Sequence, residues 1–479
     1  MKKIITHIVL ILFFAIGISV GQLTAWDGWK AGVAKTNITP ENSMWLAGYG
    51  GRTEPSQGTL HDIWAKALAL EDASGHQAVL VTSDLLGLPK GMSDKIRYQL
   101  EKELGLKKGQ VLLNSSHTHT GPVLQDALYD IYPLDAEELH KIEAYSDKLT
   151  EKIIGLVRQA FAQLGPAEIY SGNGTARFQV NRRNNNEPAL AEQSELNGPN
   201  DHAVPVLKIT RPGGELMAVA FGYACHPTVL GINQWSGDYP GFAQLELEKE
   251  HPGALALFFQ GAGGDQNPLP RRTIPLARQY GRTLAAAVDR VMEEDMQLLQ
   301  PTLSTAYTEI ELNLSAPPTL RELTKAYETN SGYQKRWAGR MKEKAEKGET
   351  FQKTYPYPLQ VWKLGNQSVF ALGGELLVGY AIELKKIFGN NIFVLGYSND
   401  VMAYIPTDKV LLEGGYEGET SQIVYGLPAK WEPGIEDKIL SGIEALAKTA
   451  GVQNSKKQDE QQIRQFVTDV QMKKGDEYV

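Results

Sequence analysis

The 479-residue sequence predicts a mixed α/β (α+β) fold, one large domain whose strands are buried between helices. Short apolar runs of strand length alternate with helix-length segments along most of the chain. Hydrophobic residues make up 42% of the sequence and charged residues 22%, which suits a protein with a substantial core. Several apolar runs end in polar residues and a turn, so we expect polar groups to gather at strand ends.

The chain opens with a segment typical of a secretory signal peptide. Lys2 and Lys3 precede the apolar run IITHIVLILFFAIGISVG, and small residues occur at Gly21 and Ala25. We therefore expect residues 1–25 to be removed on export, to the periplasm or the medium. A membrane anchor is the alternative, given the length of the run. No later segment is apolar enough to suggest a transmembrane span in the mature chain.

Net charge and cysteine content narrow the class of protein. The formal net charge of −8 argues against a nucleic-acid partner, which normally requires a basic surface. Cys225 is the one cysteine, so no disulfide can form within the chain. These features fit an exported bacterial enzyme better than a small extracellular module.

The strand and helix signals follow in order. Residues 76–88 (HQAVLVTSDLLGL) predict a buried strand with a polar exit, and helices are expected at 93–104 and 136–164. Further strands are expected at 111–116, 203–209, 217–225, 254–260, 369–375 and 391–397. Helical stretches between several of these strands support the α/β class.

Two polar regions stand apart from this pattern. Residues 319–353 are rich in Lys, Glu and Arg and predict an exposed helix, with a lid as the alternative. The C-terminal tail, from about Gln453 onward, is strongly polar and is expected to be either a frayed helix or disordered. We therefore predict a signal peptide at 1–25, a catalytic domain at 26–450 and a polar tail at 451–479.

Two histidines lie one residue apart in LLNSSHTHTGP, residues 112–122. In an extended segment alternate side chains share a face, so His117 and His119 are expected to point the same way. Two such imidazoles can bind one metal ion, or one can bind while the other contacts a substrate; zinc accepts neutral imidazole readily. A hydrogen-bonded pair of histidines in a turn is the alternative.

Two more strand ends carry candidate groups. His226 ends an apolar run, and Cys225 before it is expected to face the other way as a small core residue. In FFQGAGGDQNP, residues 258–268, glycines bring backbone N–H groups close to any ligand, and we expect the Gly263 and Gly264 turn to stabilise an oxyanion. A tight strand-to-helix turn is the alternative.

The C-terminal third adds a carboxylate and a tyrosine. Glu375 follows two glycines at a strand end, where a carboxylate among apolar residues needs a partner or a metal ion. Tyr404 comes shortly after the next strand. Because all these groups lie at strand ends, they together predict a mononuclear metal hydrolase.

The chain resembles the neutral/alkaline ceramidases, a family of zinc amidases. The likeness rests on motifs in the family's order, over nearly the whole mature chain: AGVAKTNITP, HDIWAKALAL, SSHTHTGP, ACHPT, SGDYPGFA, GYSNDVMAYIPT and GGYEGE. The resemblance implies a zinc-dependent amide hydrolase that uses a zinc-activated water. It implies four zinc ligands: His117, His226, Glu375 and Tyr404.

The resemblance also implies residues beside the metal. His119 is expected to contact the substrate, and Tyr416 matches the tyrosine of a Tyr-Glu-Gly motif. A basic residue near the site matches Arg182, with Arg183 as its rival. We expect Asp265 to orient another site residue.

The sequence departs from the family pattern at Asn267. Ceramidases carry a serine here, in a Gly-Asp-x-Ser-Pro type motif. An amide cannot replace a hydroxyl that attacks or shuttles a proton, so Asn267 is expected to be an oxyanion or substrate contact. Either the metal-activated water does all the work, or the substrate differs. The chain also ends soon after these motifs, so we expect no immunoglobulin-like C-terminal domain.

Three functions therefore stay open. The first is a ceramidase-like amidase acting on a sphingolipid. The second is a zinc-dependent deacylase of an N- or O-acylated carbohydrate, on which tryptophans could stack: Trp45, Trp64, Trp235, Trp337 and Trp362. The third is a non-catalytic zinc-containing binding protein. The oligomeric state is not predicted.

Overall fold

The computed structural model describes residues 26–455, so the predicted signal peptide and most of the predicted tail lie outside the described residues. The mixed α/β class is confirmed. Among the described helices, none combines the length and apolar character that crossing a membrane requires. The domain boundaries at 26 and 450 stay predictions.

The larger sheet has nine strands. They are β1 Trp29–Asn37, β2 Trp64–Glu71, β3 Gln77–Ser83, β4 Val111–Ser115, β5 Gly165–Thr175, β7 Ala203–Thr210, β8 Leu216–Tyr223, β9 Leu255–Gln260 and β11 Gln297–Leu298. The order along the main path is β4-β3-β2-β1-β5-β7-β8-β9, and β11 pairs with β5. Only the outermost pairs, β3 with β4 and β8 with β9, are parallel.

A second sheet of four strands has the order β12-β13-β14-β16. Its strands are β12 Leu303–Asn313, β13 Thr354–Leu364, β14 Gln367–Leu372 and β16 Phe393–Leu395. Here the parallel pair is β14 with β16. The carboxyl ends of each parallel pair lie at the same edge of its sheet, so the loops that leave them start side by side.

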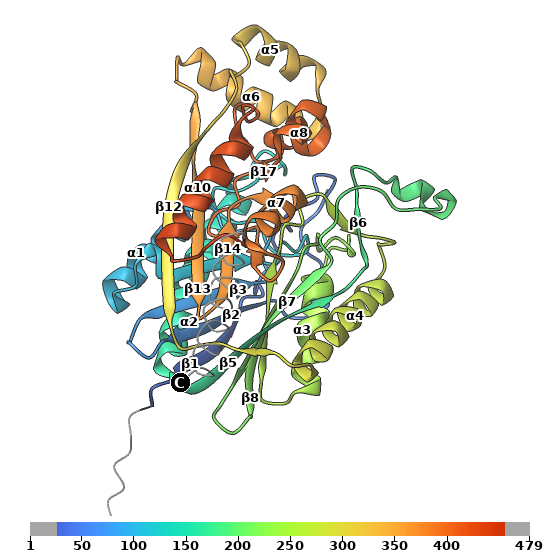
Figure 1. The fold of residues 1–479 in the computed structure, drawn as a ribbon. Coiled ribbons are helices and arrows are strands. Elements are labelled where there is room, and N and C mark those ends of the chain that lie inside the picture. The colour runs from blue at the N-terminus through green and yellow to red at the C-terminus, as the bar shows by residue number, and fades with distance from the viewer. Residues whose placement is uncertain (1–25, 456–479) are drawn as a thin grey trace, which may run out of the picture.

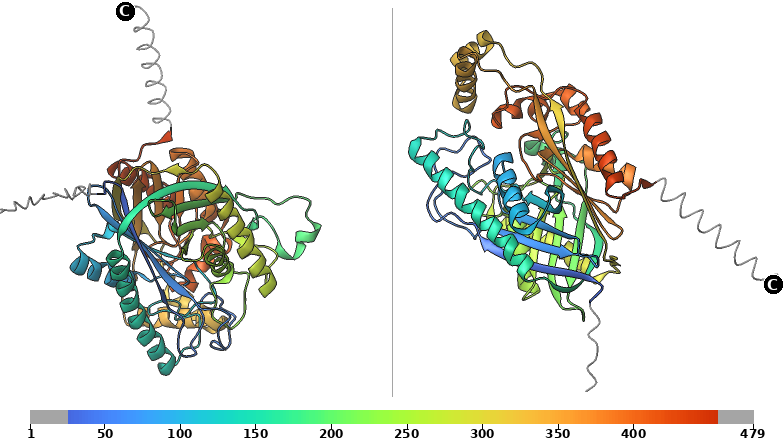
Figure 2. Two further views of the ribbon diagram at one scale, coloured as in Figure 1. Left: turned by 90° about the horizontal axis from the view of Figure 1, so that it is seen from below. Right: turned by 90° about the vertical axis from the view of Figure 1, so that its left-hand side faces the viewer.

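The two sheets face each other, and helices cover their outer faces (Figures 1 and 2). Leu112 and Phe259 of the larger sheet share one core cluster with Trp362 and Phe393 of the smaller. The outer face of the larger sheet packs on α1 Lys90–Leu104, α2 Ala136–Ala162, α3 Asp238–Glu250 and α4 Ile274–Glu293. The outer face of the smaller sheet packs on α7 Val378–Phe388 and α10 Ile435–Thr449.

The larger sheet curls until its two edge strands approach each other. Asn114 of β4 accepts a hydrogen bond of 2.8 Å from the backbone N–H of Gln260 in β9. The same side chain donates to the carbonyl of Gly396, just after β16, at 2.8 Å. One buried amide thus joins the exits of β4, β9 and β16.

Two short ribbons extend from these exits. In one, β6 Gln179–Asn181 pairs with β10 Gln266–Pro268, and in the other β15 Glu375–Leu376 pairs with β17 Tyr404–Ile405. Three short helices follow β17: α8 Asp408–Glu413, η3 Tyr416–Thr420 and α9 Ser421–Val424. Further short turns of helix are η1 Lys108–Gln110 and η2 Glu187–Glu192.

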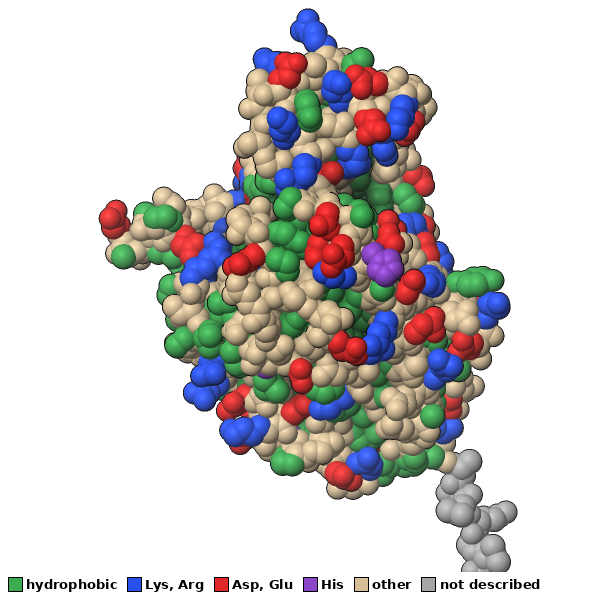
Figure 3. Space-filling view, turned by 180° about the vertical axis from the view of Figure 1, so that it is seen from behind, with side chains coloured by type: hydrophobic (Ala, Val, Ile, Leu, Met, Phe, Trp, Pro, Cys, Tyr) green, Lys and Arg blue, Asp and Glu red, His purple; other side chains and the backbone are tan. Residues whose placement is uncertain are grey.

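The Lys/Glu/Arg-rich region forms two helices where we expected one. They are α5 Leu320–Thr329 and α6 Gly332–Glu346, which project at one end of the molecule (Figure 1). The helix breaks because Gly332 has φ 55, a left-handed conformation that glycine adopts without strain. On the face in Figure 3, acidic and basic side chains are interspersed.

Candidate metal centre

The side chains of His117 and His119, the two histidines of the His-Thr-His motif, converge. Their Nε2 atoms lie 3.3 Å apart. The reason we gave was wrong, because His117 is not in an extended strand: it follows β4 with φ 66, in a turn held by a 2.8 Å hydrogen bond from its N–H to the carbonyl of Leu85. The rings therefore meet through a left-handed turn and not through strand alternation.

Backbone carbonyls fix the tautomers of two buried histidines. His117 Nδ1 lies 2.7 Å from the carbonyl oxygen of Leu86, and His226 Nδ1 lies 2.6 Å from that of Gly263. A carbonyl only accepts, so each Nδ1 carries a hydrogen and each neutral ring presents a bare Nε2 lone pair. Burial, with Arg182 adding to it, lowers the pKa of His226 to about 4, so its ring is neutral near pH 7.

The Glu375 carboxylate lies close to the Nε2 atoms of both histidines. Its Oε2 is 3.1 Å from His117 Nε2 and 2.9 Å from His226 Nε2. Burial raises the pKa of this carboxyl, and only protonated histidines would hold it well below its usual range; neutral rings with bare Nε2 atoms supply neither the charge nor the N–H. Three buried acceptor atoms therefore face one another, an arrangement that a metal ion between them would satisfy.

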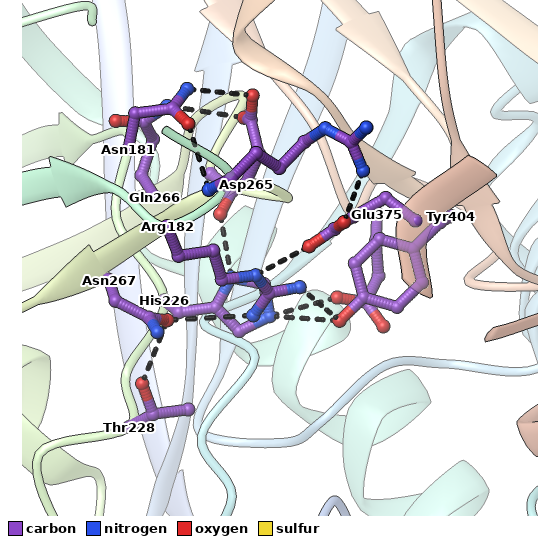
Figure 4. Close-up of polar contacts among 12 residues, drawn as sticks. Asn181, Arg182, His226, Thr228, Asp265, Gln266, Asn267, Glu375 and Tyr404 are labelled. Carbon is purple, nitrogen blue, oxygen red and sulfur yellow. Dashed lines mark hydrogen bonds and ion pairs between the residues drawn. The ribbon is translucent and has the colours of Figure 1, made fainter. Parts of the chain in front are cut away.

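Tyr404 lies beside this group because β15 and β17 pair Glu375 with Tyr404 in register. The Tyr404 hydroxyl is 3.3 Å from His226 Nε2 and accepts a 3.1 Å hydrogen bond from Arg182 Nη2 (Figure 4). Burial raises the Tyr404 pKa well above its usual value, and the Arg182 cation opposes this rise.

Arg182, not Arg183, is the basic residue at the site. Its Nε donates to Glu417 at 2.7 Å, and its Nη1 lies 3.5 Å from Asn267 Oδ1. Arg183 bonds the other oxygen of Glu417 and contacts neither Tyr404 nor Asn267 among the described residues. The β6–β10 ribbon brings Arg182 and Asn267 together from positions 85 residues apart.

Asp265 is a positioning residue in the structure. Its buried carboxylate accepts hydrogen bonds from the N–H of Val378 at 3.0 Å and from Asn181 Nδ2 at 3.1 Å. It thereby ties the end of β6, just before Arg182, to the start of α7. Burial raises the Asp265 pKa.

The expected oxyanion role of the glycine turn is wrong. The N–H of Gly263 donates to the carbonyl of Gly261 at 2.9 Å, and that of Gly264 to Leu376 at 2.9 Å. Neither is free to meet a substrate. Cys225 is a core residue, as expected, and lies in the cluster beneath β8.

An open cavity of about 740 Å³ leads to the group. Six of the residues named from the sequence line it: His119, Arg182, Arg183, Asn267, Tyr404 and Tyr416. His117, His226 and Glu375 lie deeper. None of the five tryptophans proposed as sugar-stacking surfaces lines the cavity, and Trp45, Trp235, Trp337 and Trp362 are packed in core clusters instead.

His119 stands between the cavity and the deeper histidines. Burial and then the neighbouring His117 and His226 lower its pKa well below the usual value. Its buried Nδ1 has no hydrogen-bond partner among the described residues. Together the three histidines form a group whose ligand atoms lie within 4.8 Å of one another and could hold a metal ion.

Comparison with known proteins decides the family. A sequence profile described as "Neutral/alkaline non-lysosomal ceramidase, N-terminal" matches residues 29–268, half of the chain. The chain belongs to this family. The matched part includes His117, His119, Arg182 and His226, whereas Glu375 and the tyrosines lie beyond it.

Individual relatives in the ceramidase family are distant. The neutral ceramidase of Drosophila pseudoobscura pseudoobscura is 23% identical over 331 residues, which cover 62% of this chain and 46% of the relative. That of Drosophila melanogaster is 23% identical over 250 residues, or 50% of this chain and 34% of the relative. The chain thus spans less than half the length of these curated relatives.

Solved structures of the ceramidase family share the fold. The neutral ceramidase from Pseudomonas aeruginosa superposes with a TM-score of 0.68 at 18% identity, over 89% of this chain and 75% of that chain. A structure described as "Ceramidase complexed with C2" gives 0.69 at 17% identity, over 89% of this chain and 76% of that chain.

Two tyrosines at the site escaped the sequence analysis. The Tyr425 hydroxyl donates to Glu375 Oε1, and the Tyr397 ring lies 4.5 Å from the ring of His117. Tyr425 is 50 residues from Glu375 and lies in no motif that we recognised, so no sequence signal pointed to it. Tyr397 ends a predicted strand, where only its position hinted at the site.

Proposed function

We propose that this chain is a zinc-dependent hydrolase of an N-acyl amide bond. The observation that carries the proposal is the buried meeting of three acceptor atoms: the Nε2 atoms of His117 and His226 and the Oε2 of Glu375. Family membership supports amide chemistry.

The donor set fits zinc. Neutral imidazole nitrogens and a carboxylate are ligands that zinc prefers, and a hydroxyl from Tyr404 is less usual. We assign the metal to His117, His226, Glu375 and Tyr404, and leave His119 on the cavity side. When bound, zinc supplies Lewis acidity and lowers the pKa of a water from ~15.7 to about 7.

The chain's own residues provide the remaining chemistry. His119 lies between the cavity and the metal group, so its ring can hold a proton or donate to a carbonyl oxygen. The Arg182 guanidinium donates a hydrogen bond to the Tyr404 hydroxyl and supplies positive charge where an oxyanion develops. The Asn267 amide reaches the same cavity wall and can donate to a substrate; it has no nucleophilic role.

The acyl substrate is tested by turnover. Zinc-loaded protein is given a long-chain ceramide, an N-acylated sugar and a simple N-acyl amine, each with and without chelator. We expect chelator-sensitive amine release from at least one of them. His119→Ala should lose about 100-fold or more in rate while keeping its zinc.

His140→Ala is the matched control, because His140 is exposed on α2 and should keep full rate. No release from any substrate by a protein that holds zinc would favour the non-catalytic binding protein. Release from the sugar alone would favour the carbohydrate deacylase.

We also propose that the protein is exported. The support is the signal-like segment at residues 1–25. Intact mass of the protein recovered from cells tests this: a product shortened by about 25 residues is expected, and a full-length product in the cytoplasm contradicts it.

A further inference from the structure

The cavity that leads to His117, His226 and Glu375 is lined mainly by charged and polar side chains and by three tyrosines. Only Leu269 and Pro188 contribute aliphatic side chains to its wall. A long acyl chain gains free energy by covering apolar surface, roughly 25 cal/mol per Å². Apart from the rings of Tyr49, Tyr404 and Tyr416, this wall offers little such surface. Four arginines line it instead: Arg182, Arg183, Arg271 and Arg272.

Three of these arginines are neutralised by carboxylates in the same wall. Arg182 and Arg183 share Glu417, at 2.7 and 2.8 Å, and Arg183 also pairs with Glu413 at 2.9 Å. Arg271 pairs with Glu187 at 2.7 Å. These ion pairs leave Arg183 and Arg271 little charge for a ligand, while the remaining N–H groups of Arg182 are directed at Tyr404 and the metal site.

Arg272 is different. It makes no ion pair with any carboxylate among the described residues. Its Nη1 donates to the Tyr49 hydroxyl at 2.7 Å, and its guanidinium carbon lies 4.9 Å from the centre of the Tyr49 ring. The remaining N–H groups of this exposed side chain are available for a ligand.

Tyr49 connects this cation to the site. Its ring centre is 4.7 Å from that of His119, so a single aromatic ring separates Arg272 from the histidine at the end of the cavity. A second guanidinium without a carboxylate partner, Arg52, lies 5.4 Å from the same ring and donates to the His119 carbonyl at 2.8 Å. Two cations therefore lie against Tyr49: Arg272, which lines the cavity, and Arg52, which is buried and does not line it.

We propose that the amide accepted here carries an anionic group, a carboxylate or a phosphate, which Arg272 binds beside Tyr49. The planar guanidinium presents paired N–H donors that match the oxygens of either group. This inference rests on the proposed function, since it names the class of amide that the site takes. A compact, charged N-acyl amide fits this wall better than a long neutral lipid.

The test measures binding, so it does not depend on turnover. Calorimetry on chelator-stripped protein compares N-octanoylglycine with N-octanoylglycinamide, which differ only in the charged group. We expect the acid to bind roughly tenfold tighter, as one charge-assisted contact allows. N-octanoylphosphoethanolamine provides the phosphate arm, and tighter binding of it than of the acid assigns the group as phosphate.

Variants locate the effect. Arg272→Gln should reduce the preference for the acid to within about twofold, and Arg272→Lys should keep part of it. Arg282→Gln, an exposed change of the same kind on α4, should leave the preference unchanged. Circular dichroism checks that each variant is folded.

Three results would overturn the inference: equal binding of acid and amide, an unchanged preference in Arg272→Gln, or binding of neither while ceramide binds. Loss of the proposed function gives a different result, because it appears as missing amide cleavage by zinc-loaded protein while the binding preference stays.

Discussion

At the scale of single residues, two backbone carbonyls decide what the buried histidines offer. Leu86 and Gly263 accept from the Nδ1 atoms of His117 and His226, so both Nε2 atoms turn toward Glu375 without hydrogens. Partners of this kind orient ligands and raise their basicity. The chemistry of the centre therefore depends on groups that would never touch the metal.

Tyr425→Phe tests such a partner. The hydroxyl of Tyr425 donates to Glu375 Oε1, and its loss leaves one carboxylate oxygen unpaired in a buried site. We expect zinc affinity to fall about 10- to 100-fold, measured by competition with a chelating dye. Tyr98→Phe, at a 62% exposed residue on α1, is the control and should bind zinc like wild type.

Asp400→Asn tests a buried acid outside the metal group. Burial raises the pKa of Asp400 to about 7, and Tyr355 donates to its carboxyl at 2.7 Å. An acid with a higher pKa in the folded state binds more protons when folded, so stability falls as pH rises from about 4 through 7. Relative to Asp400→Asn, wild type should lose about 2–4 kcal/mol over this range in urea unfolding.

A constant difference between the two proteins across this pH range contradicts the assignment of a raised Asp400 pKa.

Single residues were only partly predictable from sequence. His117, His226 and Glu375 follow apolar runs, and strand ends are where sites gather, so their candidacy could be read from the chain. The sequence could not show that the Gly263 and Gly264 amides are unavailable as oxyanion donors. Their hydrogen-bond partners, at Gly261 and Leu376, depend on how two loops pack.

At the scale of elements, the centre is built where three parallel strand pairs end. β4, β8 and β9 leave the larger sheet, and β14 and β16 leave the smaller one, all with polar loops. The Asn114 side chain joins three of these exits through hydrogen bonds to backbone groups. The two short ribbons then set Glu375 against Tyr404 and place Arg182 within reach of Asn267.

Gly264→Ala tests the contact between the β9 exit and β15. A Cβ at this position would lie 2.7 Å from the carbonyl oxygen of Glu375. The backbone must shift, so we expect a loss of about 1–3 kcal/mol in unfolding free energy and weaker zinc binding. Gly91→Ala, on α1 with no atom within 4 Å of the new Cβ, should be neutral or slightly stabilising.

Equal stability and zinc affinity in these two alanine variants would show that the close contact between Gly264 and the backbone of β15 is not needed.

The elements were more predictable than their partners. Helix α2 and most strands follow from apolar periodicity, since each buries a whole face. The break between α5 and α6 was missed, although Ser331-Gly332 marks it. The pairing of β15 with β17 could not be foreseen, because two-residue strands carry no periodic signal.

At the scale of the whole molecule, the centre joins the two sheets. Its groups come from positions 117 to 404 and from exits of both sheets. A metal ion would bind there only to the folded chain, because the unfolded chain does not bring these groups together. Binding should therefore stabilise the entire domain.

Zinc removal tests this coupling. Unfolding free energy should rise by about 2.7 kcal/mol when free zinc is 100 times its Kd, and chelator should reverse the rise. His226→Ala should show no response. A zinc response of equal size in His226→Ala would place the stabilising metal elsewhere.

The measurement that tests the central claim most directly is the zinc content of purified wild type, His226→Ala and His251→Ala. His251 is the matched control, since it caps α3 and pairs with Asp289 at 2.7 Å, away from the cavity. We predict about one zinc per chain in wild type and His251→Ala, and at least about tenfold less in His226→Ala. Equal zinc in the two variants, or none in wild type, would contradict a metal centre at these strand ends.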